Sequence, residues 1–357
     1  MRLGIGLYRD MLNKKNYQFA QQAGCTDVVA HLANYYVGNI LPGTNGKQNY
    51  GVCALNDPIW EKENIIKMKE EMAEYGLKFY AIENFAPSDW YDVLLDGPKR
   101  DEQMAGLKKI IQNAGEAGIK VFGYNFSIAG VWGHTRLHVA RGGAESACFD
   151  DETAGKDSPI PLGEVWNMTY DTHAPEGNLA PVTHEELWDR YKRFVLELLP
   201  VAEKYGVQLA LHPDDPPMPT MRGQARLVYQ PRFYEKVRQI SNSPSNGFEL
   251  CLGSIQEMTE GNVYDTLRYA LECNAAPYIH FRNVKGKVPH YKEVFVDEGD
   301  IDMLKIAQIL KEYDYQGVLI PDHTPLFECE DAWYAGMTYA LGYMKAVKQM
   351  LWGKENV

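Results

Sequence analysis

The chain has 357 residues, 45% of them hydrophobic and 24% charged, with a formal net charge of −12. This is the composition of a globular protein with a large core. The excess of negative charge disfavours binding to nucleic acid and to anionic membrane surfaces. It leaves room for a small anionic substrate, because a local cation can override the overall field.

The N-terminal sequence MRLGIGLYRD turns polar too early for a secretion signal, and no apolar run approaches the roughly 18 residues of a membrane-spanning helix. We therefore expect a cytoplasmic protein without a membrane partner. The six cysteines include no CxxC pair, so we expect free and mostly buried thiols.

Short apolar runs of strand length recur along the chain. They comprise residues 2–7, 26–32, 77–83, 119–125, 207–212, 247–252, 277–284 and 316–322. Stretches of helical period separate them, for example 58–75, 98–117, 184–205, 229–240, 300–313 and 331–352. Several helical stretches are followed by a glycine that we expect to end the helix, namely Gly24, Gly76, Gly118, Gly206 and Gly317.

Strand–helix alternation repeated about eight times predicts an α/β protein whose parallel strands close into a (β/α)8 TIM barrel. A doubly wound open sheet is the alternative, but no GxGxxG motif follows any strand, so its dinucleotide-binding form has no support. We expect one barrel domain over residues 1–357. Long insertions follow strand 2 (33–56) and strand 4 (127–183). Both fall on the active-site face of a barrel, and we interpret them as lids or dimer-contact loops at the mouth.

The predicted strands end in residues that bind metals or move protons. In chain order these are Glu83, Asn125, His212, Cys251, His280 with Arg282, and Asp322 with His323. In a barrel the carboxyl ends of all strands converge on one mouth, so residues far apart in sequence become neighbours. A single histidine or cysteine in a strand is more often a core residue. Several at consecutive strand ends are harder to explain that way.

Burying this many polar groups costs several kcal/mol unless they pair with each other or with a cation, so a shared metal is the economical explanation. His212, Cys251, His280 and Asp322 form a borderline-soft set that suits Zn²⁺, Fe²⁺, Co²⁺ or Mn²⁺ better than Ca²⁺ or Mg²⁺. Four protein ligands would close a tetrahedral Zn²⁺ site, so catalysis favours Fe²⁺ or Mn²⁺.

Three further residues are candidates for substrate binding. Arg282 lies two residues after His280 and shares its strand face, so it could bind a substrate carboxylate or form an ion pair with Glu83 or Asp322. Asn125 and Glu83 are candidates for contacts with substrate hydroxyls or for support of the metal ligands.

The segments LALHPDDPP, ELCLGS, IHFRNV, DEGDIDM and PDHTP resemble, in order, segments of the mannonate dehydratase family. AIEN, VFGYNF and GYMKAV are also similar to that family, and the N-terminal stretch resembles a divergent branch of it. The resemblance implies a TIM-barrel enzyme of hexuronate breakdown. Such an enzyme would convert D-mannonate to 2-keto-3-deoxy-D-gluconate and water with Mn²⁺ or Fe²⁺, as a homodimer or larger oligomer.

Residue by residue, the resemblance places the family's metal ligands on the same four residues, His212, Cys251, His280 and Asp322. It places a catalytic acid–base residue on His323. It also implies a catalytic tyrosine, for which the chain offers Tyr334 or Tyr339, and we assign Tyr334. Removal of the C2 proton and loss of the C3 hydroxyl require a base and an acid, and we assign one transfer to His323 and the other to Tyr334.

The sequence departs from the family pattern at Tyr291-Lys292-Glu293, where Phe-His-Glu is frequent, and in the loop after His323. These departures bear on the substrate more than on the metal. One alternative is a metal-dependent sugar isomerase or epimerase on the same barrel, for which an oxygen and imidazole shell without Cys251 would be expected. Another is a non-catalytic sugar-acid binding protein, against which the Asp322-His323 pair argues.

Overall fold

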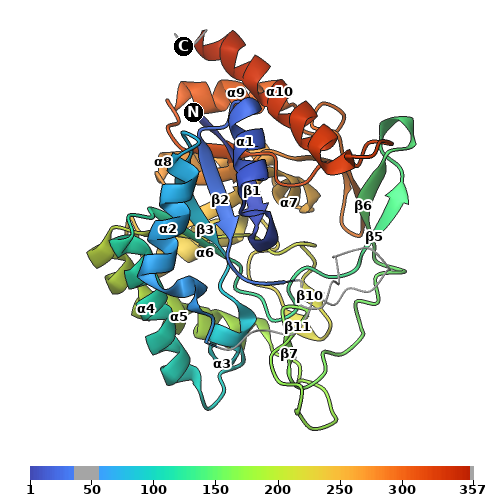
Figure 1. Cartoon of the computed structure of the whole chain (residues 1–357). Coiled ribbons are helices and arrows are strands. Elements are labelled where there is room, and N and C mark those ends of the chain that lie inside the picture. Colours follow the sequence, from blue (N-terminus) through green and yellow to red (C-terminus); the bar gives the residue numbers. More distant parts are fainter. Residues whose placement is uncertain (36–55, 354–357) are drawn as a thin grey trace.

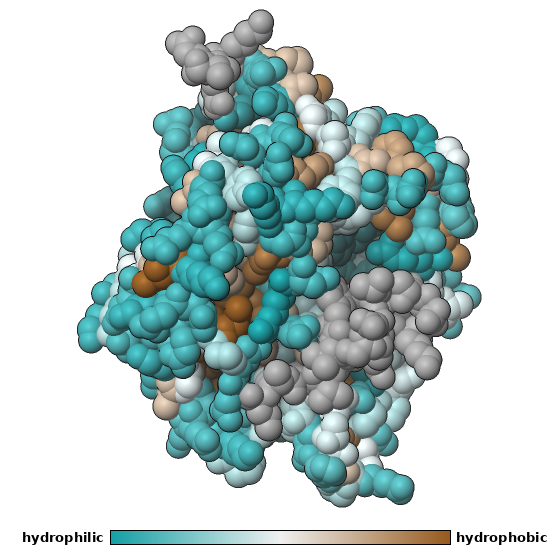
Figure 2. Space-filling view, in the orientation of Figure 1, coloured by the Kyte–Doolittle hydropathy of each residue, from teal (hydrophilic) through white to brown (hydrophobic). Residues whose placement is uncertain are grey.

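A computed structural model describes residues 1–35 and 56–353. Within these residues no helix is long and apolar enough to cross a membrane. The insertion predicted over 33–56 lies almost entirely outside the described residues. In the view of Figure 2, hydrophilic side chains cover most of the surface, and hydrophobic ones form small separate patches.

Eight parallel strands close into a barrel in the order β1-β16-β13-β12-β9-β4-β3-β2. Their bounds are β1 (Arg2–Tyr8), β2 (Asp27–His31), β3 (Lys78–Glu83), β4 (Val121–Tyr124), β9 (Gln208–Leu211), β12 (Asn246–Cys251), β13 (Tyr278–His280) and β16 (Val318–Ile320). Apolar side chains on both faces of these strands are buried, as expected for a parallel sheet covered by helices.

Helices surround the barrel on the outside (Figure 1). They are α1 (Lys14–Gln22), α2 (Lys62–Ala73), α3 (Tyr91–Leu95), α4 (Arg100–Glu116), α5 (His184–Tyr205), α6 (Arg232–Ile240), α7 (Leu252–Glu257), α8 (Val263–Glu272), α9 (Met303–Glu312) and α10 (Ala332–Trp352). Local sequence explains the ends of α5. Thr183 and Glu186 form a reciprocal capping box at its start, and Gly206 ends it in the left-handed conformation.

The predicted (β/α)8 barrel is confirmed, and each of the eight apolar runs overlaps one barrel strand. Two details differ. The run 277–284 is not one strand, because β13 ends at His280 and the chain leaves the barrel as β14 (Asn283–Lys287). Gly317 does not end a helix: α9 stops at Glu312, and Asp314 takes the left-handed conformation with a φ of 46°. A Cβ at Gly317 would lie 2.5 Å from the carbonyl oxygen of Pro277, so close backbone approach requires this glycine.

The segment between β4 and α5 contains four short strands, namely β5 (His134–His138), β6 (Glu145–Asp150), β7 (Glu164–Val165) and β8 (Met168–Thr169). β5 and β6 join β14 and β15 (His290–Val294) in an antiparallel sheet of order β14-β15-β6-β5. In Figure 1 β5 and β6 lie to one side of the barrel. A two-stranded ribbon, β10 (Thr220–Met221) and β11 (Gln224–Ala225), follows β9.

Candidate metal centre

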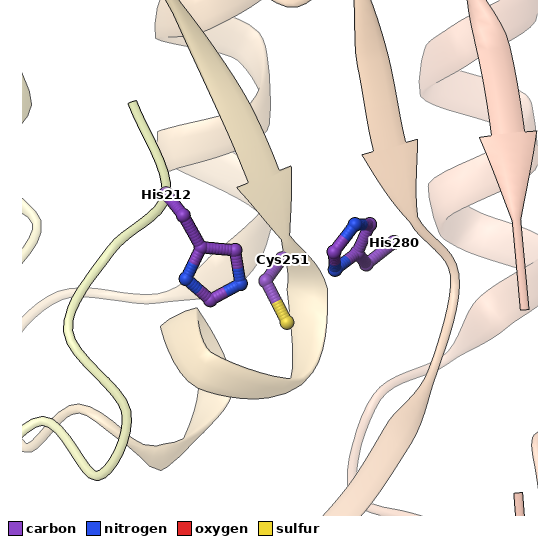
Figure 3. A group of neighbouring side chains, drawn as sticks. All are labelled: His212, Cys251 and His280. Atoms are coloured by element: carbon purple, nitrogen blue, oxygen red, sulfur yellow. The ribbon is translucent and has the colours of Figure 1, made fainter. Parts of the chain in front are cut away.

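Three potential metal ligands converge where adjacent barrel strands end. His212 follows the last residue of β9, and Cys251 and His280 are the last residues of β12 and β13, paired directly in the strand register. One donor atom from each residue lies within 4.8 Å of the other two. The two imidazole rings lie on either side of the Cys251 sulfur (Figure 3). The strand ends therefore place two nitrogens and a sulfur around one point.

Asp322, the fourth predicted ligand, is not part of this close group but lies beside it. It follows β16 in the left-handed conformation, with a φ of 61°. Its Oδ2 is 3.2 Å from Nδ1 of His280 and 3.1 Å from Nε of Arg282. Burial opposes ionisation of this carboxyl, but His280 and His323 hold the pKa of Asp322 well below its ordinary value.

The thiol of Cys251 is poised to ionise. Burial raises its pKa, but the positive charge of Arg282 and hydrogen bonds with His212 and His280 outweigh burial and lower the pKa to about 5. The thiolate is the form of cysteine that binds metals. At neutral pH the site therefore offers a sulfur anion between two histidine side chains.

The buried polar atoms of the site fit a bound cation. Among the described residues, neither ring nitrogen of His280 and neither carboxylate oxygen of Glu249 makes a hydrogen bond of good geometry, although all are buried. Unsatisfied buried polar groups cost free energy, and a cation is one way to satisfy them. Two imidazoles, a thiolate and a nearby carboxylate suit a borderline-soft divalent metal.

His323 lies at the rim of this site with its side chain 47% exposed. Its Nδ1 is 3.0 Å from Oε1 of Glu293, and its Nε2 is 3.5 Å from Oδ1 of Asp322. Partial burial lowers the pKa of His323, but the carboxylates of Asp322 and Glu293 raise it to about 9. The ring is thus oriented by one carboxylate and remains accessible from the mouth.

Arg282 is buried and faces protein carboxylates. Its guanidinium lies 2.6 Å from Oδ2 of Asp215, 2.9 Å from Oε1 of Glu257 and 3.1 Å from Oδ2 of Asp322. Of the two ion pairs weighed for Arg282 from the sequence, the one with Asp322 is present. The same side chain therefore links a candidate metal ligand to the loop after β9.

Asn125 and Glu83 are both buried and have different partners. The side-chain amide of Asn125 donates to the carbonyl oxygen of Pro213 at 3.2 Å, which ties the end of β4 to the loop that follows His212. Glu83 points into the barrel, 3.5 Å from Nε2 of His31 and 3.5 Å from Nε2 of His280. Asn125 therefore supports the loop beside His212, and Glu83 contacts the candidate ligand His280 itself.

Tyr334 does not join this group. Its hydroxyl donates to Oδ1 of Asn16 at 2.7 Å, and its ring packs edge-on against Phe19, so it contacts α1 on the outside of the barrel. Tyr339, the other candidate, contacts Arg141 and Phe295 instead. The role predicted for Tyr334 in proton transfer has no support from these contacts.

Sequence reasoning missed Glu249 and the role of the antiparallel sheet. Glu249 lies two residues before Cys251 on the same inward face of β12, and a charged residue inside an apolar run was the available signal. Tyr291 of β15 donates to Oδ1 of Asp215 at 2.9 Å, and its hydroxyl lies 2.6 Å from Nε2 of His134 of β5. No local sequence pattern predicts that β5 and β15 lie next to the loop after β9.

The closed barrel and the donor set at its mouth define the class: a TIM-barrel protein with a candidate metal centre at the strand ends. The chain belongs to the D-mannonate dehydratase (UxuA) family, which it matches over residues 18–353.

Individual relatives agree with that assignment. The mannonate dehydratase of Streptococcus pneumoniae (strain 70585) is 31% identical over 277 residues, covering 74% of this chain and 74% of that protein. The mannonate dehydratase of Streptococcus uberis is 31% identical over 276 residues, covering 74% and 78%. The crystal structure of mannonate dehydratase from Streptococcus suis serotype 2 superposes with a TM-score of 0.75 at 25% identity, covering 100% and 96% of the two chains.

More distant structures share the fold. A xylose isomerase domain protein from Planctomyces limnophilus superposes with a TM-score of 0.60 at 13% identity, covering 99% of both chains. At that identity the likeness concerns the barrel alone.

Proposed function

We propose that this protein is a hydro-lyase that converts D-mannonate to 2-keto-3-deoxy-D-gluconate and water, in cytoplasmic hexuronate breakdown. The observation that carries the proposal is the convergence of His212, Cys251 and His280 beside His323, in a chain of the D-mannonate dehydratase family. The relatives named above support the substrate. We also propose that the protein forms a homo-oligomer.

His212, Cys251, His280 and Asp322 would hold the metal, which we propose to be Mn²⁺ or Fe²⁺. When bound, such an ion supplies positive charge that offsets the charge developing next to a substrate carboxylate. The thiolate of Cys251 and the ionised carboxylate of Asp322 meet the requirement that ligands be deprotonated.

His323 carries one of the two proton transfers. The reaction removes the C2 proton and expels the C3 hydroxyl, which leaves as water once it is protonated, and the resulting enol becomes the 2-keto product. Glu293 occupies Nδ1 of His323, so Nε2 is the nitrogen that exchanges a proton with substrate. Arg282 holds Asp322 in place. The second proton-transfer group belongs to the mouth, and the contacts of Tyr334 with α1 leave Tyr334 out of this proposal.

The proposal is tested by assaying a panel of aldonates with chelator-treated protein reconstituted with Mn²⁺ or Fe²⁺, following formation of the 2-keto-3-deoxy acid. We expect turnover of D-mannonate that depends on the added metal. A panel without dehydration under either metal would overturn the proposal.

Sugar isomerases or epimerases remain the second candidate class, because Glu83, Glu249 and His280 form a buried oxygen and imidazole group. The sulfur of Cys251, however, faces the two histidines rather than turning away, which favours the dehydratase. Ketoses included in the same panel distinguish the two classes. Conversion of a ketose to its epimer or aldose without loss of water would favour the alternative.

A further inference from the structure

The two ring nitrogens of His280 face different partners. Nδ1 lies 3.2 Å from Oδ2 of Asp322, the candidate metal ligand, whereas Nε2 lies 3.1 Å from Oε1 of Glu249. A neutral imidazole has one N–H donor and one lone pair available to a metal. The surroundings therefore divide the ring into a side directed at the metal site and a side directed at a buried carboxylate.

We propose that Glu249 is a positioning residue: in the metal-bound protein it accepts a hydrogen bond from Nε2–H of His280, which lies 3.1 Å away but without hydrogen-bond geometry here, and so presents Nδ1 to the metal. The inference rests on the metal site proposed above and adds to it the second partner of one ligand. Histidines that bind metals usually donate their other ring N–H to a carboxylate or carbonyl, which fixes the tautomer and the ring orientation.

Backbone geometry holds the two side chains together. Cys251 and His280 are paired in the parallel register of β12 and β13, as are Glu249 and Tyr278. Residues two apart share a strand face, so the side chain of Glu249 lies below that of Cys251 on the inward face. Glu249 and His280 are thus neighbours on adjacent strands, one level apart in the barrel interior.

Glu249, rather than Glu83, is the carboxylate available to Nε2 of His280. Glu83, the other acid near Nε2, is 3.5 Å away and already accepts from the hydroxyl of Tyr278 at 3.4 Å and faces His31 at 3.5 Å. Glu249 is fully buried, and among the described residues its only ion pair is the one with His280. Its carboxylate also interacts with the hydroxyl of Tyr278, which contacts Glu83 as well. His280 is therefore the ring that Glu249 can orient.

Gly123 leaves room for this carboxylate. A Cβ at Gly123 of β4 would lie 2.3 Å from Oε2 of Glu249 and 2.1 Å from the hydroxyl of Tyr278. Real Cβ atoms do not approach that closely, so an alanine at this position would displace the Glu249 side chain. Gly123→Ala consequently perturbs Glu249 together with Tyr278, without changing the chemistry of either side chain.

The test measures the dissociation constant and stoichiometry of Mn²⁺ for the full chain by calorimetric titration after chelator treatment. We expect one equivalent in the wild type. Glu249→Leu should raise the Mn²⁺ dissociation constant about 10–100-fold, which is the usual cost of losing such a partner. Glu249→Gln keeps an acceptor oxygen without its charge and should weaken binding less. Gly123→Ala should act in the same direction as Glu249→Leu and serves in its place if that variant does not fold.

Asp27→Asn is the matched control. Asp27 is equally buried, but it lies at the start of β2, at the opposite end of the barrel, and pairs with Arg2. This variant should lower stability without changing the Mn²⁺ dissociation constant. If Glu249 mattered only for barrel stability, Glu249→Leu would leave the Mn²⁺ dissociation constant unchanged, as Asp27→Asn should.

A spectroscopic readout reports the tautomer directly. In ¹⁵N-histidine-labelled protein loaded with Zn²⁺, a two-bond proton–nitrogen spectrum should show His280 protonated at Nε2 and unprotonated at Nδ1. Unchanged Mn²⁺ affinity in Glu249→Leu, or a proton on Nδ1, would overturn the inference. Two equivalents of Mn²⁺ in the wild type and one in Glu249→Gln would overturn it too, because Glu249 would then be a ligand. Wild-type protein that binds no metal would instead refute the metal site itself.

Discussion

The guanidinium of Arg282 lies 2.6 Å from the carboxylate of Asp215, with both side chains almost fully buried. The pair joins the rim loop after β9 to the chain leaving β13, and the same guanidinium also contacts Glu257 and Asp322. The arrangement of the loops at the barrel mouth thus depends on the Arg282 guanidinium, which is surrounded by carboxylates.

Arg282→Met should lower the free energy of unfolding by about 3–5 kcal/mol, because it leaves buried carboxylates without their counter-charge. Urea denaturation measures the change. Arg268→Met is the matched control: Arg268 pairs with Glu312 on the surface and should cost less than about 1 kcal/mol. Equal losses in the two variants would contradict the view that burial sets the strength of the Arg282 network.

Cys251→Ser should weaken metal binding at least about 10-fold, since a neutral hydroxyl replaces a thiolate ligand. Co²⁺ titration provides the measurement, because the wild type should show a sulfur-to-cobalt charge-transfer band that the variant lacks. Cys273→Ser, at the end of α8, should leave both the band and the affinity unchanged. A persistent band in Cys251→Ser would mean that another thiol binds the metal.

His323→Asn should reduce kcat by about 10²–10⁴-fold while the metal content stays at the wild-type level, because the proton carrier is lost and the proposed ligands remain. Metal analysis of the purified variant accompanies the assay. Full activity in this variant would remove His323 from the mechanism.

Tyr334→Phe should keep kcat within about twofold and lower the free energy of unfolding by about 1 kcal/mol, the usual contribution of one hydrogen bond. The lost bond is the one to Asn16 on α1. Steady-state kinetics and thermal denaturation together decide the point. Loss of activity comparable to that of His323→Asn would restore Tyr334 as the second proton-transfer residue and would require it to reach the mouth during turnover.

Asp89→Asn should change how stability depends on pH. Burial and the nearby charge of Asp57 raise the pKa of Asp89 to about 7 in the folded state. The folded protein therefore holds this proton more tightly than the unfolded chain, and the wild type loses stability as the pH rises from the unfolded pKa of about 4 towards 7. The stability of the variant relative to the wild type should grow by about 2 kcal/mol between pH 5 and pH 8.

Denaturation at the two pH values measures this difference, with Asp101→Asn at an exposed position as the control. Parallel pH profiles for Asp89→Asn and the wild type would show that Asp89 does not titrate in this range.

The barrel could be predicted because its signals are local. Alternation of strand and helix, and of inward and outward side chains within a strand, fixes which residues face the mouth. His212, Cys251 and His280 were therefore predicted to be neighbours although other elements separate them in sequence. Glu249 was not predicted, although the same periodicity places it on the inward face two residues before Cys251.

Other parts of the site depend on packing that no local pattern specifies. The direction of Tyr334 is set by how the first turn of α10 lies against α1, and its position after His323 suggests the mouth instead. Glu293, which contacts His323, lies on β15, and β15 pairs with β6, a strand from an insertion far earlier in the chain. Pairing over such sequence separations is a property of the folded chain and leaves no periodicity to read.

The antiparallel sheet has a consequence for how this barrel could be reduced or rebuilt. Glu293, which orients His323, lies on β15, and β15 is bordered by β6 on one side and β14 on the other. The proposed metal ligands come instead from the ends of barrel strands or directly after them. A chain from which the 127–183 insertion is removed should therefore still bind the metal but should not turn over substrate. The part of the fold that holds the metal would then be separable from the part that orients the proton-transfer residue.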